Sequence, residues 1–384
     1  MSLPSSSSHS HNARQLSQAI LRLLKQNPDL KPRYQRAKDT VRAFRNPAFY
    51  EMETRCNLKC EGCYYFEGGD TWKINGNRPL SDWQHFFSQE AERGVTMAYF
   101  VGAEPALAQE RLLAAAEHFP WGNIGTNGTI PLDKDIPYRI GVSVWAGDDN
   151  SDRLLRGASV FRKALGNYAG DSRAIMLFTV SSQTINQVPE VARLCYEHGV
   201  ELTYNLYSPT HSYLNKLARH QQHDDKFFRF SDLTHSPMFS DDDLHRTREI
   251  LGASIEDYPE TVAYCQEYND LMCQPGPRYQ LDDQGIAINC HSRVIDPMKY
   301  YTCDLEPGQV KCGTPDIDCS QCRMYSGGWS SRFTPSLQDV SCREAFIGWL
   351  NTIDTLGRIF LYPRPAWLQQ ESATSRAAEA SALE

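Results

Sequence analysis

Apolar and polar residues follow two alternating patterns between residues 47 and 208. Short apolar runs typical of buried strands alternate with stretches in which apolar residues recur every three or four positions, as on one face of a helix. Because strands that alternate with helices form parallel sheets, this region predicts a parallel sheet with ligands at the carboxyl ends of its strands. The expected strands are residues 49–53, 97–101, 123–125, 139–145, 175–180 and 201–207, and the expected helices are 111–118, 160–168, 188–198 and one from Ser81 to a stop at Gly94.

The regions on either side of this one differ from it in composition and in the spacing of their apolar residues. Residues 1–12 are rich in serine and are expected to be disordered, whereas 13–45 carry apolar residues at helical spacing among many basic ones. Ser81 and Gln84 have the spacing of a capping box at a helix start. These sequence patterns predict five regions: residues 1–46, a disordered segment and helix; 47–208, the alternating strands and helices; 209–262, a helical insertion or linker; 263–345, a cysteine-rich domain; and 346–384, a helix and tail.

Composition excludes several classes of protein. No run approaches the ~18–20 apolar residues that a membrane helix needs, and the N-terminus lacks the layout of a secretory signal, so a cytoplasmic protein without a membrane partner is expected. The net charge of -8 argues against nucleic-acid binding. Twelve cysteines at short spacings in a reducing compartment indicate metal or cluster ligands instead of disulfides.

The strongest chemical signal is the segment 54–66, TRCNLKCEGCYYF, which we call the front cysteine loop. It places Cys56, Cys60 and Cys63 in a C-x3-C-x2-C spacing directly after an expected strand. Three thiols cannot form a closed disulfide framework, and no fourth Cys or His follows nearby to complete a tetrahedral zinc site. A 4Fe–4S cluster held through three irons fits better, although a zinc knuckle remains the alternative.

At this loop the sequence resembles the radical S-adenosylmethionine (SAM) superfamily, over roughly residues 49–207 and in the order of its motifs. The resemblance implies that Cys56, Cys60 and Cys63 hold a 4Fe–4S cluster whose open iron binds SAM. It also implies reductive cleavage of SAM to a 5′-deoxyadenosyl radical that abstracts a hydrogen atom. The family usually has an aromatic residue just before the third cysteine, where this chain has Gly62.

Further motifs at strand ends resemble the SAM-binding residues of that family. Gly102-Ala103-Glu104-Pro105 is similar to its Gly-Gly-Glu-Pro motif, and Glu104 would accept a hydrogen bond from the SAM amine. Thr126 and Asn127 begin a turn of the family's TNG type, and Ser143 lies where the family has a serine near the SAM carboxylate or ribose. Arg153 and Arg156 follow in an expected loop, where the family has an arginine for the carboxylate, and the sequence does not choose between them.

The C-terminal cysteines resemble the auxiliary-cluster extension of the family, the SPASM or twitch domain. Cys273, Gly285 and Cys290 match its opening hairpin. Two clusters would be held by Cys265, Cys273, Cys290 and Cys322 and by Cys303, Cys312, Cys319 and Cys342. A single cluster would use Cys273, Cys290, Cys319 and Cys322, and a zinc site on Cys312, Cys319 and Cys322 is a third arrangement.

Two predictions concern the substrate. His291 follows Cys290 where related sulfatase-maturing enzymes carry an acidic base, so it is a candidate catalytic base, the alternative being a polar loop residue beside a cluster. Tyr204, Asn205 and Tyr207 end the last expected strand and are candidates for lining the substrate pocket, the alternative for the aromatic residues being plain core packing.

Together these features predict an α/β protein: a partial (β/α)6 TIM-like barrel with a C-terminal cysteine-rich auxiliary-cluster domain. The expected cofactors are SAM and 4Fe–4S clusters, one that binds SAM and one or two auxiliary. The expected activity is oxidative modification, a cross-link or a dehydrogenation, of a ribosomal peptide in natural-product maturation, with an electron donor such as flavodoxin or ferredoxin as partner. A small-metabolite substrate and a non-enzymatic cysteine-rich metal-binding or redox-sensing protein are the alternatives.

Overall fold

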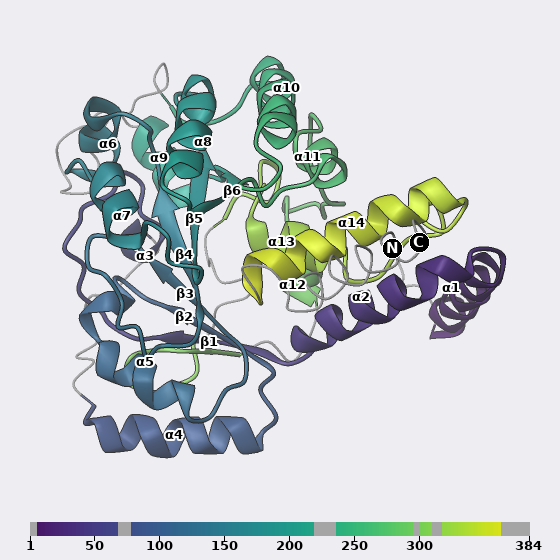
Figure 1. Cartoon of the computed structure of the whole chain (residues 1–384), viewed down its shortest axis with the longest axis horizontal. Coiled ribbons are helices and arrows are strands. Elements are labelled where there is room, and N and C mark those ends of the chain that lie inside the picture. Colours follow the sequence, from purple (N-terminus) through teal and green to yellow (C-terminus); the bar gives the residue numbers. More distant parts are fainter. Residues whose placement is uncertain (1–5, 68–77, 219–235, 295–298, 309–316, 362–384) are drawn as a thin grey trace, which may run out of the picture.

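The sheet of the protein is parallel and open. A computed structural model describes residues 6–67, 78–218, 236–294, 299–308 and 317–361, and within them seven strands pair in the order β6-β5-β4-β3-β2-β1-β7, every pair parallel (Figure 1). The predicted partial TIM-like barrel is therefore confirmed. The strands are β1 Pro47–Glu51, β2 Met97–Val101, β3 Gly122–Thr126, β4 Arg139–Val144, β5 Ala174–Val180, β6 Glu201–Leu206 and β7 Lys299–Tyr301.

The helices follow the strands in the alternating region and dominate both flanks (Figure 1). Within the alternating region they are α3 Tyr64–Glu67, α4 Leu80–Glu92, α5 Gln109–Ala116, α6 Asp149–Arg156, α7 Phe161–Tyr168 and α8 Val188–Glu197, with 3-10 turns η3 Pro105–Leu107 and η4 Ile185–Gln187. The flanks add α1 Ser6–Gln26, η1 Pro28–Leu30, α2 Lys31–Ala43, α9 His211–Ala218, α10 Asp241–Asp257, α11 Gln266–Met272, α12 His291–Val294, α13 Tyr325–Ser330 and α14 Arg343–Phe360.

The two faces of the sheet pack against different parts of the chain. Neighbouring residues of a strand point to opposite faces, so Tyr50 and Phe49 meet different partners. Tyr50 packs against Phe87 of α4, with ring centroids 5.5 Å apart. Phe49 stacks on Tyr99 at 4.5 Å, and Tyr99 contacts Phe360 of α14 at 6.0 Å. The C-terminal helix thus packs against the face of the sheet that α4 leaves open.

Five expectations about the elements are wrong. Residues 6–12 are helical, as the start of α1, and the expected single N-terminal helix is interrupted before Pro28, which cannot donate a hydrogen bond from its backbone nitrogen. The capping box is absent: α4 starts at Leu80 with Pro79 as its N-cap and no capping side chain. Residues 149–156 form helix α6 instead of a loop. The cysteine-rich region contributes β7, which pairs with β1 and extends the sheet beyond six strands.

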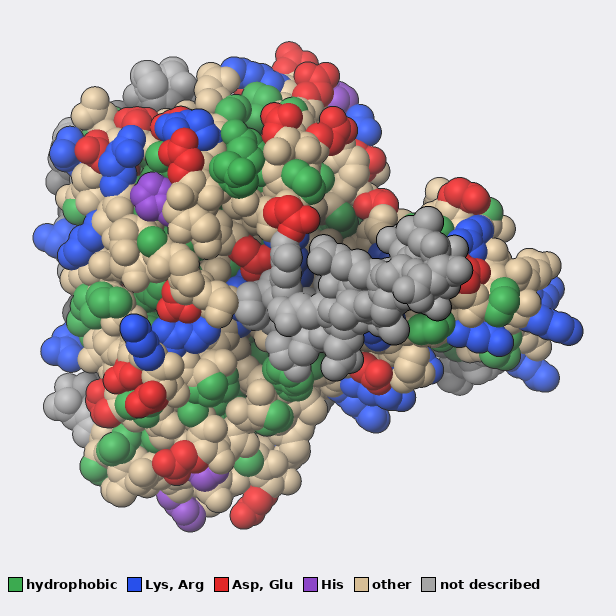
Figure 2. Space-filling view, viewed as in Figure 1, with side chains coloured by type: hydrophobic (Ala, Val, Ile, Leu, Met, Phe, Trp, Pro, Cys, Tyr) green, Lys and Arg blue, Asp and Glu red, His purple; other side chains and the backbone are tan. Residues whose placement is uncertain are grey.

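The N-terminal helices carry the basic residues expected there. Figure 2 shows Lys and Arg side chains gathered over α1 and α2 at the end of the molecule, and Arg14, Arg22 and Lys25 are exposed. Ile20, Leu23 and Leu24 of α1 are buried in the core, whereas Leu21 is exposed. These helices therefore present a solvated basic face. Among the helices that the structure describes, none combines the length and apolarity needed to cross a bilayer.

Candidate functional site

The front cysteine loop lies between β1 and α3, at the carboxyl end of β1, and its three thiols are half-buried. Backbone hydrogen bonds tie it to the end of α6: the Lys59 amide donates to the Arg156 carbonyl at 3.4 Å and the Glu61 amide to the Leu155 carbonyl at 2.6 Å. The loop is therefore anchored by the helix that the sequence did not predict.

Gly62 in this loop has a tertiary explanation. Its φ of +57° favours glycine, and a Cβ there would lie 3.0 Å from the ring of Tyr213 on α9. The Tyr213 hydroxyl donates to Glu61 Oε1 at 3.2 Å. An aromatic ring thus packs at the position before the third cysteine, but it is supplied by a distant helix. The sequence alone gave no signal for this contact.

The surroundings of Cys56 and Cys63 keep these thiols protonated in the absence of a metal. Cys56 Sγ accepts from the Leu58 amide at 3.4 Å and from Asn127 Nδ2 at 3.8 Å. Burial raises the pKa of Cys56, and these two hydrogen bonds act against the shift. Burial and the neighbouring Cys60 raise the pKa of Cys63 to about 12. Neighbouring thiols of this kind stay protonated until a metal deprotonates them.

The described ranges hold no three Cys, His, Asp or Glu side chains close enough to share one metal ion. A zinc ion needs its sulfur ligands at about 2.3 Å from one centre. The thiolates of a cubane each hold a different iron and need not meet at a point. The donor set of the front cysteine loop, three thiols with N–H groups directed at one of them, fits a 4Fe–4S cluster.

Glu104 lies beside this loop with its carboxylate buried, 1% exposed. It accepts from the Thr126 hydroxyl at 2.6 Å, from the Asn127 amide at 2.8 Å and from the Ala106 amide at 3.0 Å. Burial raises the pKa of Glu104, and these bonds together with the charge of Arg156 oppose the rise. Three donors leave about one of the four acceptor positions of the carboxylate open.

Two glycines allow the backbone to approach at this end of the sheet. Gly102 has a φ of +126°, and a Cβ there would lie 2.7 Å from the Glu53 carbonyl oxygen. Gly128, in the Thr126-Asn127-Gly128 turn, has a φ of +76° and would clash with Val142. The turn places the Asn127 side chain so that it donates to both Cys56 and Asn57.

Of the two arginines, only Arg156 faces this region. It is 2% exposed, and it donates to the Ser143 carbonyl at 2.6 Å, while its Nε has no hydrogen-bond partner. Arg153 is exposed and reaches Asn150 at 3.5 Å. The Ser143 hydroxyl accepts from Trp145 Nε1 at 3.2 Å. Burial distinguishes the two arginines, since Arg156 is enclosed beside Ser143 and Arg153 is exposed, and a contact of Arg156 with SAM stays a prediction.

Three of the C-terminal cysteines meet in one place. Cys290, Cys319 and Cys322 are buried, pack together and line a common small cavity; we call them the rear cysteine site. Gly285, with a φ of +75°, turns the hairpin that leads to Cys290, where Leu281 and Ala287 pair. Tyr64 packs against this site, so the residue after Cys63 lies between the two groups of cysteines.

The remaining cysteines lie apart from one another. Cys273 is buried beside Asn269, with its thiol 3.4 Å from Asn269 Oδ1, and Cys265 packs in the main core. Cys303 donates to the Glu51 carbonyl at 3.1 Å, next to β7. Cys342 is exposed and caps α14. Cys312 lies outside the described residues. The placement brings together three of the four ligands of the single-cluster arrangement, whose assignment remains a prediction.

Three of the predicted substrate residues, His291, Tyr204 and Tyr207, lie in different surroundings. His291 starts α12, and its Nδ1 is 2.9 Å from the Ser330 carbonyl oxygen, so this nitrogen is engaged within the protein. Tyr207 lines a cavity described below, but Tyr204 is fully buried with its hydroxyl bonded to Ser254. The prediction that Tyr204 lines the pocket is wrong because its side chain points into the core.

Comparison with known proteins identified solved structures alone. No family model matches the sequence, and no curated protein sequence matches it significantly. SuiB of Streptococcus suis bound to S-adenosylmethionine is 16% identical, with a TM-score of 0.47 over 67% of this chain and 58% of SuiB. SuiB bound to its precursor peptide SuiA is 15% identical, with a TM-score of 0.48 over 77% and 64%. Native anSMEcpe with bound AdoMet is 15% identical, with a TM-score of 0.43 over 68% and 74%.

The chain thus spans less than two thirds of the length of the SuiB structures that it matches. At these identities and TM-scores the likenesses decide neither activity nor substrate. What can be inferred about function depends on the contacts around the two groups of cysteines.

Proposed function

We propose that this chain is a radical SAM enzyme that modifies a peptide oxidatively. The observation that carries the proposal is the connection of Cys56 through Asn127 to Glu104. One amide side chain donates to the thiol, and the backbone of the same residue donates to the buried carboxylate. A cysteine loop, a TNG turn and an acidic strand end, far apart in sequence, therefore form one hydrogen-bonded unit.

Within this unit, charges of both signs flank the front cysteine loop. The Glu104 carboxylate retains acceptor capacity for an ammonium group, and the Arg156 guanidinium retains an unpartnered Nε for a carboxylate. These are the two charged groups of the methionine part of SAM. A cluster held by Cys56, Cys60 and Cys63 would supply the electron that cleaves SAM.

The rear cysteine site supports oxidation as the outcome. It is separated from the front loop by Tyr64, whose hydroxyl bonds to the Ser208 carbonyl. The segment after β6 is joined to the rear side by the Arg323 amide, which donates to Ser208 Oγ at 2.7 Å, and by pairing of Thr210 with Ile317. A redox group held there would lie beside the end of β6, where Tyr207 is predicted to line the substrate pocket. It could accept an electron from a bound substrate.

Anaerobic reconstitution followed by iron and sulfide counting and by measurement of 5′-deoxyadenosine release tests the proposal. One front and one rear cluster predict about eight irons per chain, and about twelve would indicate two auxiliary clusters. Cys56→Ala is expected to lose about four irons and all 5′-deoxyadenosine release. The matched control is Cys195→Ala, since Cys195 is a buried thiol of α8 far from both sites. Release at the wild-type rate by Cys56→Ala would contradict the proposal, as would zinc in place of iron.

A further inference from the structure

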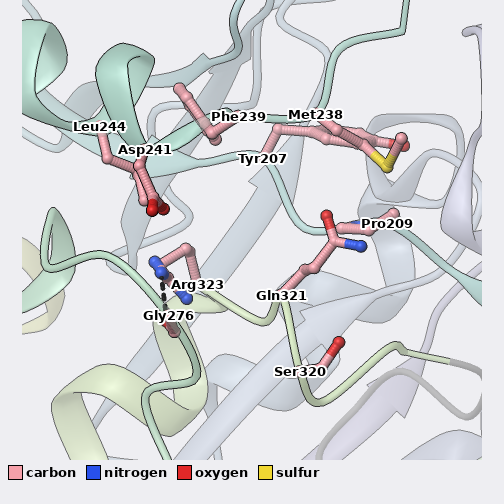
Figure 3. Close-up of a pocket in the computed structure, with 10 residues that line it drawn as sticks. All are labelled: Tyr207, Pro209, Met238, Phe239, Asp241, Leu244, Gly276, Ser320, Gln321 and Arg323. Carbon is pink, nitrogen blue, oxygen red and sulfur yellow. Dashed lines mark hydrogen bonds between the residues drawn. The ribbon is translucent and has the colours of Figure 1, made fainter. Parts of the chain in front are cut away.

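A cavity of about 180 Å³ lies at the carboxyl end of β6, beside the loop that carries Cys319 and Cys322 (Figure 3). One wall comes from the start of α10 and the residues before it. The other comes from the cysteine-bearing loop and from Gly276. The lining residues are Tyr207, Pro209, Met238, Phe239, Asp241, Leu244, Gly276, Ser320, Gln321 and Arg323.

The two walls differ in chemistry. Met238, Phe239 and Leu244 make the α10 side largely apolar, with Asp241 as its charged member (Figure 3). The opposite side is polar, and its charged member is Arg323. A ligand that suits both walls has an apolar body and a negatively charged end. Its size is limited, because about 180 Å³ is well below the ~300–1,000 Å³ of pockets for complete small molecules.

Arg323 is a buried cation without an ion-pair contact among the described residues, and the carboxylate that points towards it across the cavity is Asp241 (Figure 3). Arg323 is 4% exposed. Its terminal nitrogens donate to the carbonyls of Gln274, Gly276 and Cys322 at 2.8 to 3.1 Å, which uses three of its five N–H groups. The Nε–H is buried and has no hydrogen-bond partner.

Burial removes the solvent that would otherwise stabilise the positive charge of Arg323. Neutral carbonyl groups offset this cost only in part, and a buried guanidinium is normally retained with an anion beside it. Three sources of negative charge are near: Asp241 on the other wall of the cavity, the thiolates of the cysteines next to Arg323, and a ligand in the cavity. The apolar wall opposite Arg323 has no role if the thiolates are the only anion.

We propose that this cavity is a subsite for one amino-acid residue with an apolar side chain and a free carboxylate, which Arg323 binds. Such a group is supplied by the C-terminal residue of a peptide or by a free amino acid. The subsite serves the reaction proposed above and rests on that function for its biological meaning. The cavity lies beside the rear cysteine site, so a bound residue would lie next to the group proposed to accept an electron.

Calorimetric titration of the iron-loaded, unreduced protein tests the subsite. The probes are N-acetyl-L-leucine, its amide N-acetyl-L-leucinamide and L-leucine. The acid is expected to bind at millimolar concentration, and the amide about tenfold to a hundredfold more weakly, because it lacks the charge. Tighter binding of N-acetyl-L-leucine than of L-leucine identifies a peptide end, and the reverse order a free amino acid. Equal binding of acid and amide, or binding of neither acid, overturns the proposal.

Two variants separate ligand binding from a role toward the thiolates. Arg323→Gln is expected to bind the acid no better than the amide while keeping its full iron content. Met238→Trp fills the cavity without changing Arg323 and is expected to abolish binding, which keeps the test valid if Arg323→Gln does not fold. Loss of rear-site iron in Arg323→Gln, with unchanged binding by Met238→Trp, means that the guanidinium serves the thiolates, and the proposal is then wrong. A wild-type protein that binds the acid but releases no 5′-deoxyadenosine contradicts only the proposed function.

Discussion

The front cysteine loop and the rear cysteine site place three thiols each by different means. The front thiols lie within eight residues of one another in a loop held by backbone bonds to α6, and they are half-buried. The rear thiols come from two separate segments and are packed in a small apolar cluster with Ala287 and Ile317. A contiguous, accessible ligand set suits a site that must admit a second molecule. A buried set assembled from distant segments suits a group that stays enclosed and also holds those segments together.

The largest expected effect separates these roles directly. Cys322→Ala is expected to lose about four irons, as Cys56→Ala does, but to retain the front cluster and cleavage of SAM without substrate. It is also expected to lower the midpoint of thermal unfolding by more than Cys56→Ala, because the rear site joins segments that are distant in sequence. Iron counting, 5′-deoxyadenosine assay and calorimetry check this. Equal thermal shifts for both variants would remove the distinction between the sites.

A second comparison concerns the two arginines of α6. Arg156→Gln removes the buried guanidinium beside Ser143 and is expected to raise the KM for SAM about tenfold to a hundredfold, the value of a charged hydrogen bond. Arg153→Gln, the matched control three residues earlier on the same helix and exposed, is expected to leave KM within about twofold. Steady-state kinetics at varied SAM decide it, and a larger effect from Arg153→Gln would reverse the assignment.

The buried Glu104 predicts a smaller, pH-dependent effect. Burial raises its pKa in the folded protein above the usual value of 4.5, so the folded state binds more protons than the unfolded state between these two values. Its contribution to the free energy of unfolding is therefore present below pH 4.5 and is lost as the pH rises through the folded-state pKa, by at most about 1.4 kcal/mol per pH unit.

Urea unfolding between about pH 5 and 8 measures this contribution against Glu104→Gln, which cannot ionise. The stability of the wild type is expected to fall relative to the variant as the pH rises. A constant difference across the range would show that the hydrogen bonds from Thr126 and Asn127 compensate for burial fully.

The smallest effect is expected at the cysteines that lie apart from the rear site. Cys342→Ser changes an exposed helix cap and is expected to leave iron content and thermal stability within error of the wild type. Cys303→Ser, at a thiol that donates to the Glu51 carbonyl, is likewise expected to keep all irons. Loss of about four irons in either variant would favour the two-cluster arrangement.

Much of the fold was predictable because it depends on local patterns. Six strands, the position of the front cysteine loop and the glycine at 102 follow from apolar periodicity and from spacing within a few residues. The seventh strand was not predictable: Lys299–Tyr301 is a three-residue segment whose only structural signal is its pairing with β1. Helix α6 was also missed, since it is only eight residues long and Leu154 and Leu155 are its only apolar residues, too few to show a helical period.

The residues of the candidate site likewise fall into those predictable from the sequence and those that only the tertiary structure places. The sequence by itself determined the front thiols and the Thr126-Asn127-Gly128 turn, because each is a pattern of residues only a few positions apart, whereas the hydrogen bond that joins the two is a tertiary contact. The tertiary structure alone decided which arginine faces the site, which cysteines gather at the rear and that Arg323 is buried without a carboxylate partner among the described residues. These are contacts between segments far apart in sequence, and each depends on how the sheet brings the ends of its strands and the C-terminal region together. No local pattern encodes that geometry.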